Sequence, residues 1–170
     1  MAPQTLPRNR DFTPASLAGL TPPARLLLWA ARAWLRGQVT ERPACQQIRG
    51  RFHRAGWSQA FGYFDGFMHF LDFRQPLPPD FDRTFGPDLT ALEEDFIASL
   101  AALQRDEADR LIMFARARVA CAPARIAARH VAMEMVSAMS EAGGWLEAPA
   151  PAGTPDLSLA LLARTRAPVS

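Results

Sequence analysis

The chain has 170 residues, of which 49% are hydrophobic and 21% are charged, and its formal net charge is +2. These values are typical of one globular domain and exclude a wholly disordered chain. All 19 basic residues are arginine, which excludes enzymes that need a lysine for a Schiff base or for a P-loop. The abundance of Arg, Ala and Pro indicates a GC-rich bacterial genome.

The near-neutral total hides three blocks of opposite charge. Residues 23–54 carry seven Arg against one acidic residue, residues 55–109 carry eleven acidic residues against three Arg, and residues 110–130 carry five Arg and no acidic residue. Once these blocks are placed on helices, the two basic blocks can flank the acidic one. We therefore expect the blocks mainly to compensate one another within the fold.

The cysteines and the apolar stretches bear on the compartment. Cys45 and Cys121 are the only cysteines and form no CxxC motif, so we predict reduced, packed thiols. Residues 1–20 lack an apolar segment behind a basic start, and residues 26–31 are too short an apolar stretch to span a bilayer. We predict a cytoplasmic protein with no membrane contact and no cofactor.

Glycines and prolines divide the first half of the chain into helices. After a mobile lead over residues 1–12, a helical domain is predicted over residues 13–146. Threonine–proline pairs supply an N-cap before a first-turn proline, and glycines end helices. Thr13–Pro14 begins a short turn that stops at Gly19, and Thr21–Pro22 begins the first helix. The helices predicted in this half cover residues 22–37, 41–55 and 57–73, and Gly37 and Gly56 end the first two.

The second half begins after a proline-rich loop over residues 74–89. A Thr-x-x-Glu capping box at residues 90–93 begins the fourth helix. Residues 90–120 contain no Gly or Pro, yet a break is predicted near residues 105–106, where the apolar periodicity lapses and the charge changes sign. The last long helix is predicted over residues 123–142.

The fold class is therefore predicted as all-α, a single-domain bundle of about five helices. Gly143 and Gly144 end the last long helix, and residues 147–170 form a Pro/Ala linker with a short C-terminal helix. This tethered segment carries apolar side chains that can dock on its own domain, on another subunit or on a partner. Its candidate docking residues are Leu157, Leu161 and Leu162.

Arg25, Arg32 and Arg36 fall within a narrow sector of the first helix. Trp29 lies one turn from Arg25 and Arg32, close enough for a cation–π contact. This stripe can bind carboxylates of a partner or phosphates of a nucleic acid. Alternatively, it pairs with acidic helices of its own chain. Joint exposure of the three arginines would favour the first interpretation, and pairing within the chain the second.

The third helix has an aromatic side, predicted to be core, and a polar side. On the polar side, Asp65, His69 and Asp72 are spaced at i, i+4 and i+7, so they can share one surface and meet a divalent metal. A solvated face is the simpler interpretation, because one helix rarely supplies a complete metal site and no HExxH motif is present. No metal is therefore predicted, and the three residues remain candidates.

The leading functional prediction is a non-enzymatic bacterial regulator or adaptor that binds another protein, with a homodimer as one option. The first alternative is a DNA-binding transcriptional regulator, because residues 107–142 are predicted as helix, turn, helix with the basic block 110–130 in it. The second is a metal-dependent enzyme centred on Asp65, His69 and Asp72. No GxSxG, GxGxxG or P-loop motif points to an enzyme class.

Overall fold

In the computed structural model, the described residues are 17–40, 44–71 and 88–149, and they form six α-helices and one short 3-10 helix. The all-α fold is confirmed, with one more helix than the five expected. Residues 1–12 and most of the C-terminal linker and segment lie outside the described residues. The elements are η1 (Leu17–Gly19), α1 (Pro22–Thr40), α2 (Cys45–Arg54), α3 (Ala60–Phe70), α4 (Ala91–Leu103), α5 (Ala108–Arg118) and α6 (Ala122–Glu141).

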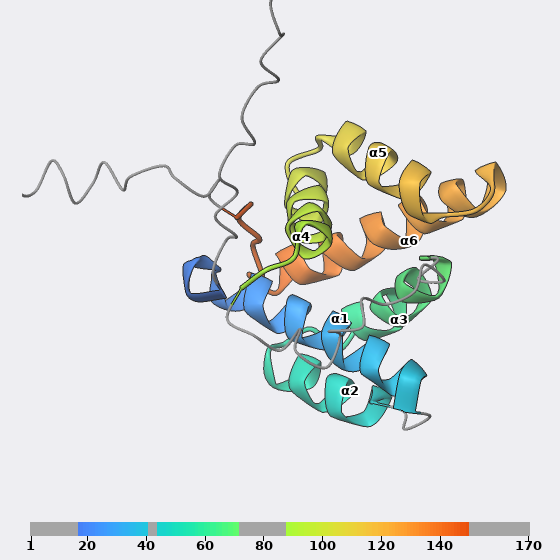
Figure 1. The fold of residues 1–170 in the computed structure, drawn as a ribbon. Coiled ribbons are helices and arrows are strands. Elements are labelled where there is room, and N and C mark those ends of the chain that lie inside the picture. Colours follow the sequence, from blue (N-terminus) through green and yellow to red (C-terminus); the bar gives the residue numbers. More distant parts are fainter. Residues whose placement is uncertain (1–16, 41–43, 72–87, 150–170) are drawn as a thin grey trace, which may run out of the picture.

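Helix α6 runs through the middle of the fold (Figure 1). It packs most extensively against α3, while α5 and α4 cover another of its sides. Helix α2 runs back along α1 in the opposite direction, and this hairpin joins the other helices through α3 and α4. The arrangement buries one continuous apolar core and leaves the outer sides of α1, α2 and α6 at the surface.

The aromatic side of α3 supplies much of this core. Phe61, Phe64 and Phe67 are buried, as predicted from their helical spacing. The ring of Phe64 packs edge-on against Phe52 of α2, with 5.3 Å between centroids. Tyr63, another aromatic residue of this helix, is 39% exposed, because the core covers a narrower sector of the helix than the aromatic residues span.

Two of the predicted glycine stops end their helices in the same way. After α2, Gly56 has φ +81°, its N–H donates to the carbonyl of His53 (3.1 Å), and the N–H of Trp57 donates to the carbonyl of Phe52 (2.7 Å). The equivalent pair of hydrogen bonds follows α6, where Gly143 has φ +75°. This Schellman motif needs a left-handed residue, and glycine adopts that conformation without a steric penalty.

Three predicted boundaries were wrong. The second helix begins at Cys45 rather than at residue 41. The third helix begins at Ala60 rather than Trp57, because the N–H of Trp57 is already used in the motif that closes α2. Helix α1 continues through Gly37 to Thr40. A glycine inside a helix costs about 1 kcal/mol relative to alanine, so packing of the helix can carry it past such a residue.

Thr21 precedes α1 as predicted, but its side chain does not cap the helix. Its Oγ1 is buried without a hydrogen-bond partner among the described residues, while its carbonyl accepts from the N–H of Arg25 (2.9 Å). Pro22 and Pro23 occupy the first two helical positions and have no N–H, so one of the two N–H groups that a capping side chain can use is missing. The other, that of Ala24, does not bond to the hydroxyl.

The predicted break between α4 and α5 is confirmed at Asp106. This residue has φ +61°, and its N–H donates to the carbonyl of Leu103 (3.1 Å), while the N–H of Glu107 donates to that of Ala102 (3.0 Å). These are again the bonds of a Schellman motif, with aspartate in the left-handed position. Aspartate enters this region more readily than most residues, but at a cost that glycine avoids.

Replacing Asp106 with Gly is therefore expected to stabilise the fold by about 1 kcal/mol, the steric cost of the left-handed conformation. The free energy of unfolding in urea measures this change. As a matched control, Arg116→Gly places glycine inside α5 and is expected to lower stability by about 1 kcal/mol. If both substitutions changed the free energy of unfolding in the same direction, the assignment of strain to Asp106 would be contradicted.

Candidate functional site

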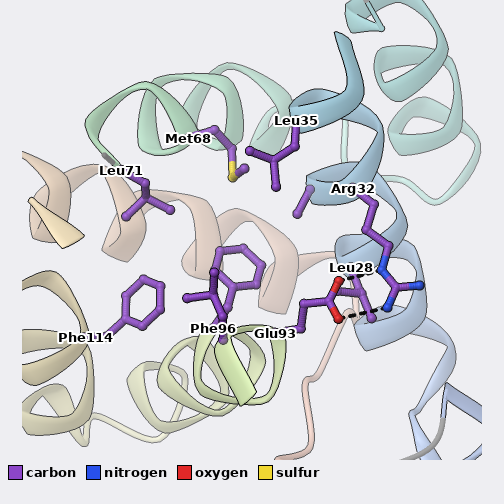
Figure 2. Close-up of a pocket in the computed structure, with 10 residues that line it drawn as sticks. Leu28, Arg32, Leu35, Met68, Leu71, Glu93, Phe96 and Phe114 are labelled. Atoms are coloured by element: carbon purple, nitrogen blue, oxygen red, sulfur yellow. Dashed lines mark hydrogen bonds and ion pairs between the residues drawn. The ribbon is translucent and has the colours of Figure 1, made fainter. Parts of the chain in front are cut away.

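One member of the predicted arginine stripe is turned into the fold. Arg32 is only 6% exposed, and its Nε and Nη2 donate to the two carboxylate oxygens of Glu93 at 2.6 and 2.9 Å (Figure 2). Its Nη2 also donates to the carbonyl of Asp88 (3.2 Å). Arg32 is thus held by α4, and the three arginines of the stripe do not share one exposed surface.

The carboxylate of Glu93 also belongs to the predicted capping box. Its Oε2 accepts from the N–H of Thr90 (2.9 Å), and the hydroxyl of Thr90 accepts from the N–H of Glu93 (3.3 Å). One carboxylate therefore caps α4 and also accepts hydrogen bonds from the buried guanidinium of Arg32 on α1. This pair and an exposed one, Arg110 with Asp95 at 3.5 Å, each join a basic block of the chain to the acidic one.

Beside the buried ion pair lies a small cavity of about 40 Å³. Figure 2 shows the side chains around it, and they come from α1, from α3 and the residue after it, and from α4 and α5. Its apolar lining includes Leu28, Leu35, Met68, Leu71, Phe96 and Phe114. Arg32 and Glu93 also line the cavity, but their polar groups bond to each other. The volume admits only a few water molecules, far less than the volume of a ligand site. We assign no ligand to this cavity.

The rest of the stripe faces outward and gains a partner from α2. Arg25 and Arg36 are exposed, and Trp29 is half-buried between them on the same side of α1. The guanidinium of Arg51 lies over the Trp29 ring, 3.9 Å from its centroid. The cation stacked on Trp29 is therefore Arg51, whereas the sequence suggested Arg25 or Arg32.

The pattern of α2 explains why its arginines reach the surface. Ile48 and Phe52, one turn apart, are its only buried residues, so every other side chain of this short helix points sideways or outward. Arg51 and Arg54 are three residues apart and lie on the same side of α2, which runs antiparallel to α1 (Figure 1). Both arginines lie in the last turn of α2, where cations interact favourably with the helix dipole.

We call this surface the arginine face and define it by Arg25, Trp29, Arg36, Arg51 and Arg54. Helices α1 and α2 contain no acidic residue. Within the described part of the chain, none of the ion pairs involves Arg25, Arg51 or Arg54. No motif in the sequence singles out Arg51 and Arg54. The sparse apolar pattern of residues 45–54 was the only available signal.

The polar side of α3 has a structural role that the sequence did not show. Asp65 accepts a hydrogen bond from the indole Nε1 of Trp34 (2.9 Å), and His69 Nδ1 lies 2.8 Å from the Asp65 carbonyl. The His69 ring meets Trp34 edge-on at 5.1 Å. Asp72 lies outside the described residues, and among those described no three His, Cys, Asp or Glu side chains form a group able to hold a metal.

The remaining candidates are placed as follows. Residues 108–141 form helix, turn, helix, as predicted. Arg110 pairs with Asp95 at 3.5 Å, and Arg125 donates to the carbonyl of Val119 (3.2 Å). Two of the five arginines in the basic block 110–130 thus form contacts within the chain. The docking residues Leu157, Leu161 and Leu162 lie outside the described residues.

Comparison with known proteins adds no assignment. No protein-family model, curated protein or solved structure matches the chain. Within the described residues, no helix has both the length and the apolar character needed to cross a membrane.

Proposed function

We propose that this protein is a non-enzymatic, cytoplasmic bacterial adaptor or regulator, and that its arginine face binds an acidic segment of a partner protein. The observation that carries the proposal is the guanidinium of Arg51 stacked on Trp29 at 3.9 Å. Stacking holds the cation in place while its edge stays available to carboxylates, which arginine binds through paired hydrogen bonds.

The composition of the face favours a protein partner over a nucleic acid. Tryptophan and arginine are the residues that most often dominate protein interfaces, and here one lies directly on the other. Nucleic-acid binding relies on many phosphate contacts and a strongly basic surface. The chain has a net charge of only +2, and the exposed acidic side chains of α4 and α5 would repel phosphate.

The test is a binding titration with a fluorescently labelled poly-glutamate peptide. We expect Arg51→Glu to weaken binding at least about tenfold, equivalent to about 1.4 kcal/mol. Trp29→Ala is expected to weaken it without changing the net charge, because the stacked cation loses its platform. Arg116→Glu makes the same charge reversal on an exposed arginine of α5 and is expected to leave binding unchanged.

A labelled DNA duplex of mixed sequence serves as the competing probe. The proposal fails if the duplex binds more tightly than the peptide and if Arg116→Glu, rather than Arg51→Glu, weakens that binding. That result would support the DNA-binding alternative through the 110–130 block. Equal losses of peptide binding for the Arg51 and Arg116 variants would also contradict it, because they would show attraction by net charge alone.

A further inference from the structure

The outward side of α6 exposes apolar residues that the arginine face does not involve. Ile126 is 72% exposed and Met133 is 44% exposed. They are seven residues apart, so they lie on the same side of the helix. The inward side of α6 is used differently, since Ala128, Ala132 and Met135 are fully buried where the helix packs on its neighbours. Ile126 and Met133 thus form an exposed stripe on a well-anchored helix.

The charges of α6 are distributed in an unfavourable order for a single helix. Arg125 and Arg129 lie in its first half, and Glu134 and Glu141 in its second. The first turn has no acidic residue, the last turn has no basic residue, and Cys121 at the N-cap makes no side-chain hydrogen bond. A helix dipole favours the reverse order, with anions near the N-terminus and cations near the C-terminus. An external helix of opposite direction would compensate both halves.

We propose that a second copy of this chain packs its α6 antiparallel to the first across this stripe. Along the helix axis, the basic half of one copy lies at the level of the acidic half of the other, and on one flank His130 of each copy meets Glu134 of its mate. Such a contact is isologous and closes as a two-fold dimer. A partner of another kind would have to reproduce this reversed order, whereas a second copy supplies it directly.

Helix geometry specifies the register of this contact. With the two-fold axis at the level of Ala132, Met133 packs against its symmetry mate and Ile126 covers Ser137 of the other copy. His130 and Glu134 lie on the same flank of the helix, both exposed, and the axis brings His130 of each copy beside Glu134 of the other. One helix pair buries little area, so we expect a weak dimer that depends on protein concentration.

Sedimentation velocity over a range of protein concentrations tests the proposal with the full chain. The native protein is expected to dimerise as concentration rises, and Ile126→Asp to remain monomeric. His130→Glu and Glu134→Arg are each expected to raise the dimer dissociation constant about tenfold, because the first places two carboxylates together and the second removes the carboxylate that faces His130. The double variant recreates an opposite-charge pair and is expected to restore dimerisation.

Trp145→Asp is the control, because Trp145 is also exposed but lies beyond the end of α6. It is expected to dimerise like the native protein, and circular dichroism checks that every variant keeps its helices. The proposal is overturned if the native chain is monomeric throughout, if Ile126→Asp leaves the dimer intact, or if the double variant associates no better than the single ones. Peptide binding by the arginine face is independent of each result.

Discussion

Replacing Glu93 with Ala is expected to destabilise the fold by about 3–5 kcal/mol, the usual cost of removing one partner from a buried ion pair. Arg32 is almost fully buried and donates hydrogen bonds to both oxygens of this carboxylate. Without Glu93 its charge stays in the core without the carboxylate that compensates it. The same substitution removes the carboxylate that accepts from the N–H of Thr90, so α4 also loses half of its capping box.

Urea unfolding followed by circular dichroism measures the change in the free energy of unfolding. Asp95→Ala is the matched control on the same helix, because its pair with Arg110 is exposed on both sides and such pairs contribute less than about 1 kcal/mol. Replacing both Arg32 and Glu93 with Leu is expected to cost less than Glu93→Ala alone, since no uncompensated charge then remains buried. Similar losses for Glu93→Ala and Asp95→Ala would refute this view of the pair.

Local signals explain why much of the fold was predictable. A capping box, a glycine stop and a lapse in apolar periodicity act within a few residues, and the structure has all three at residues 90–93, 56 and 105–106. At Thr21, the proline at the second helical position removes one of the two N–H groups that a cap can use. The overextension of the third helix came from the motif before it, which had already used Trp57.

The candidate site depended on contacts that the sequence does not encode locally. Arg25, Arg32 and Arg36 occupy nearly the same sector of α1, and the arrival of α4 decides which of them is buried. The charge blocks indicated that pairing would occur, but not that Glu93 would select Arg32. In the same way, Arg51 became part of the site only because α2 packs antiparallel to α1 and lays Arg51 on Trp29.

Replacing Gly144 with Ala is expected to destabilise the fold by about 2–3 kcal/mol, the upper range for overpacking a core. A Cβ built at Gly144 would lie 2.6 Å from Cζ2 and Nε1 of Trp57. Neither side can move away easily. The indole is buried and meets Phe52 edge-on at 5.5 Å. Gly144 is fixed through its N–H to the carbonyl of Met139 (2.8 Å) and through its carbonyl to Gln104 Nε2 (3.0 Å).

Two comparisons isolate the clash in the same unfolding measurement. Gly143→Ala meets no atom within 4 Å but must adopt φ +75°, so it is expected to cost only about 1 kcal/mol, the steric price of a left-handed residue. In a Trp57→Leu background the smaller side chain leaves room, and Gly144→Ala is expected to cost clearly less than in the native chain. An unchanged cost in that background would place the effect in the backbone of residues 143–146 rather than against the indole. The indole of Trp57 would then not be the group that excludes a side chain at residue 144.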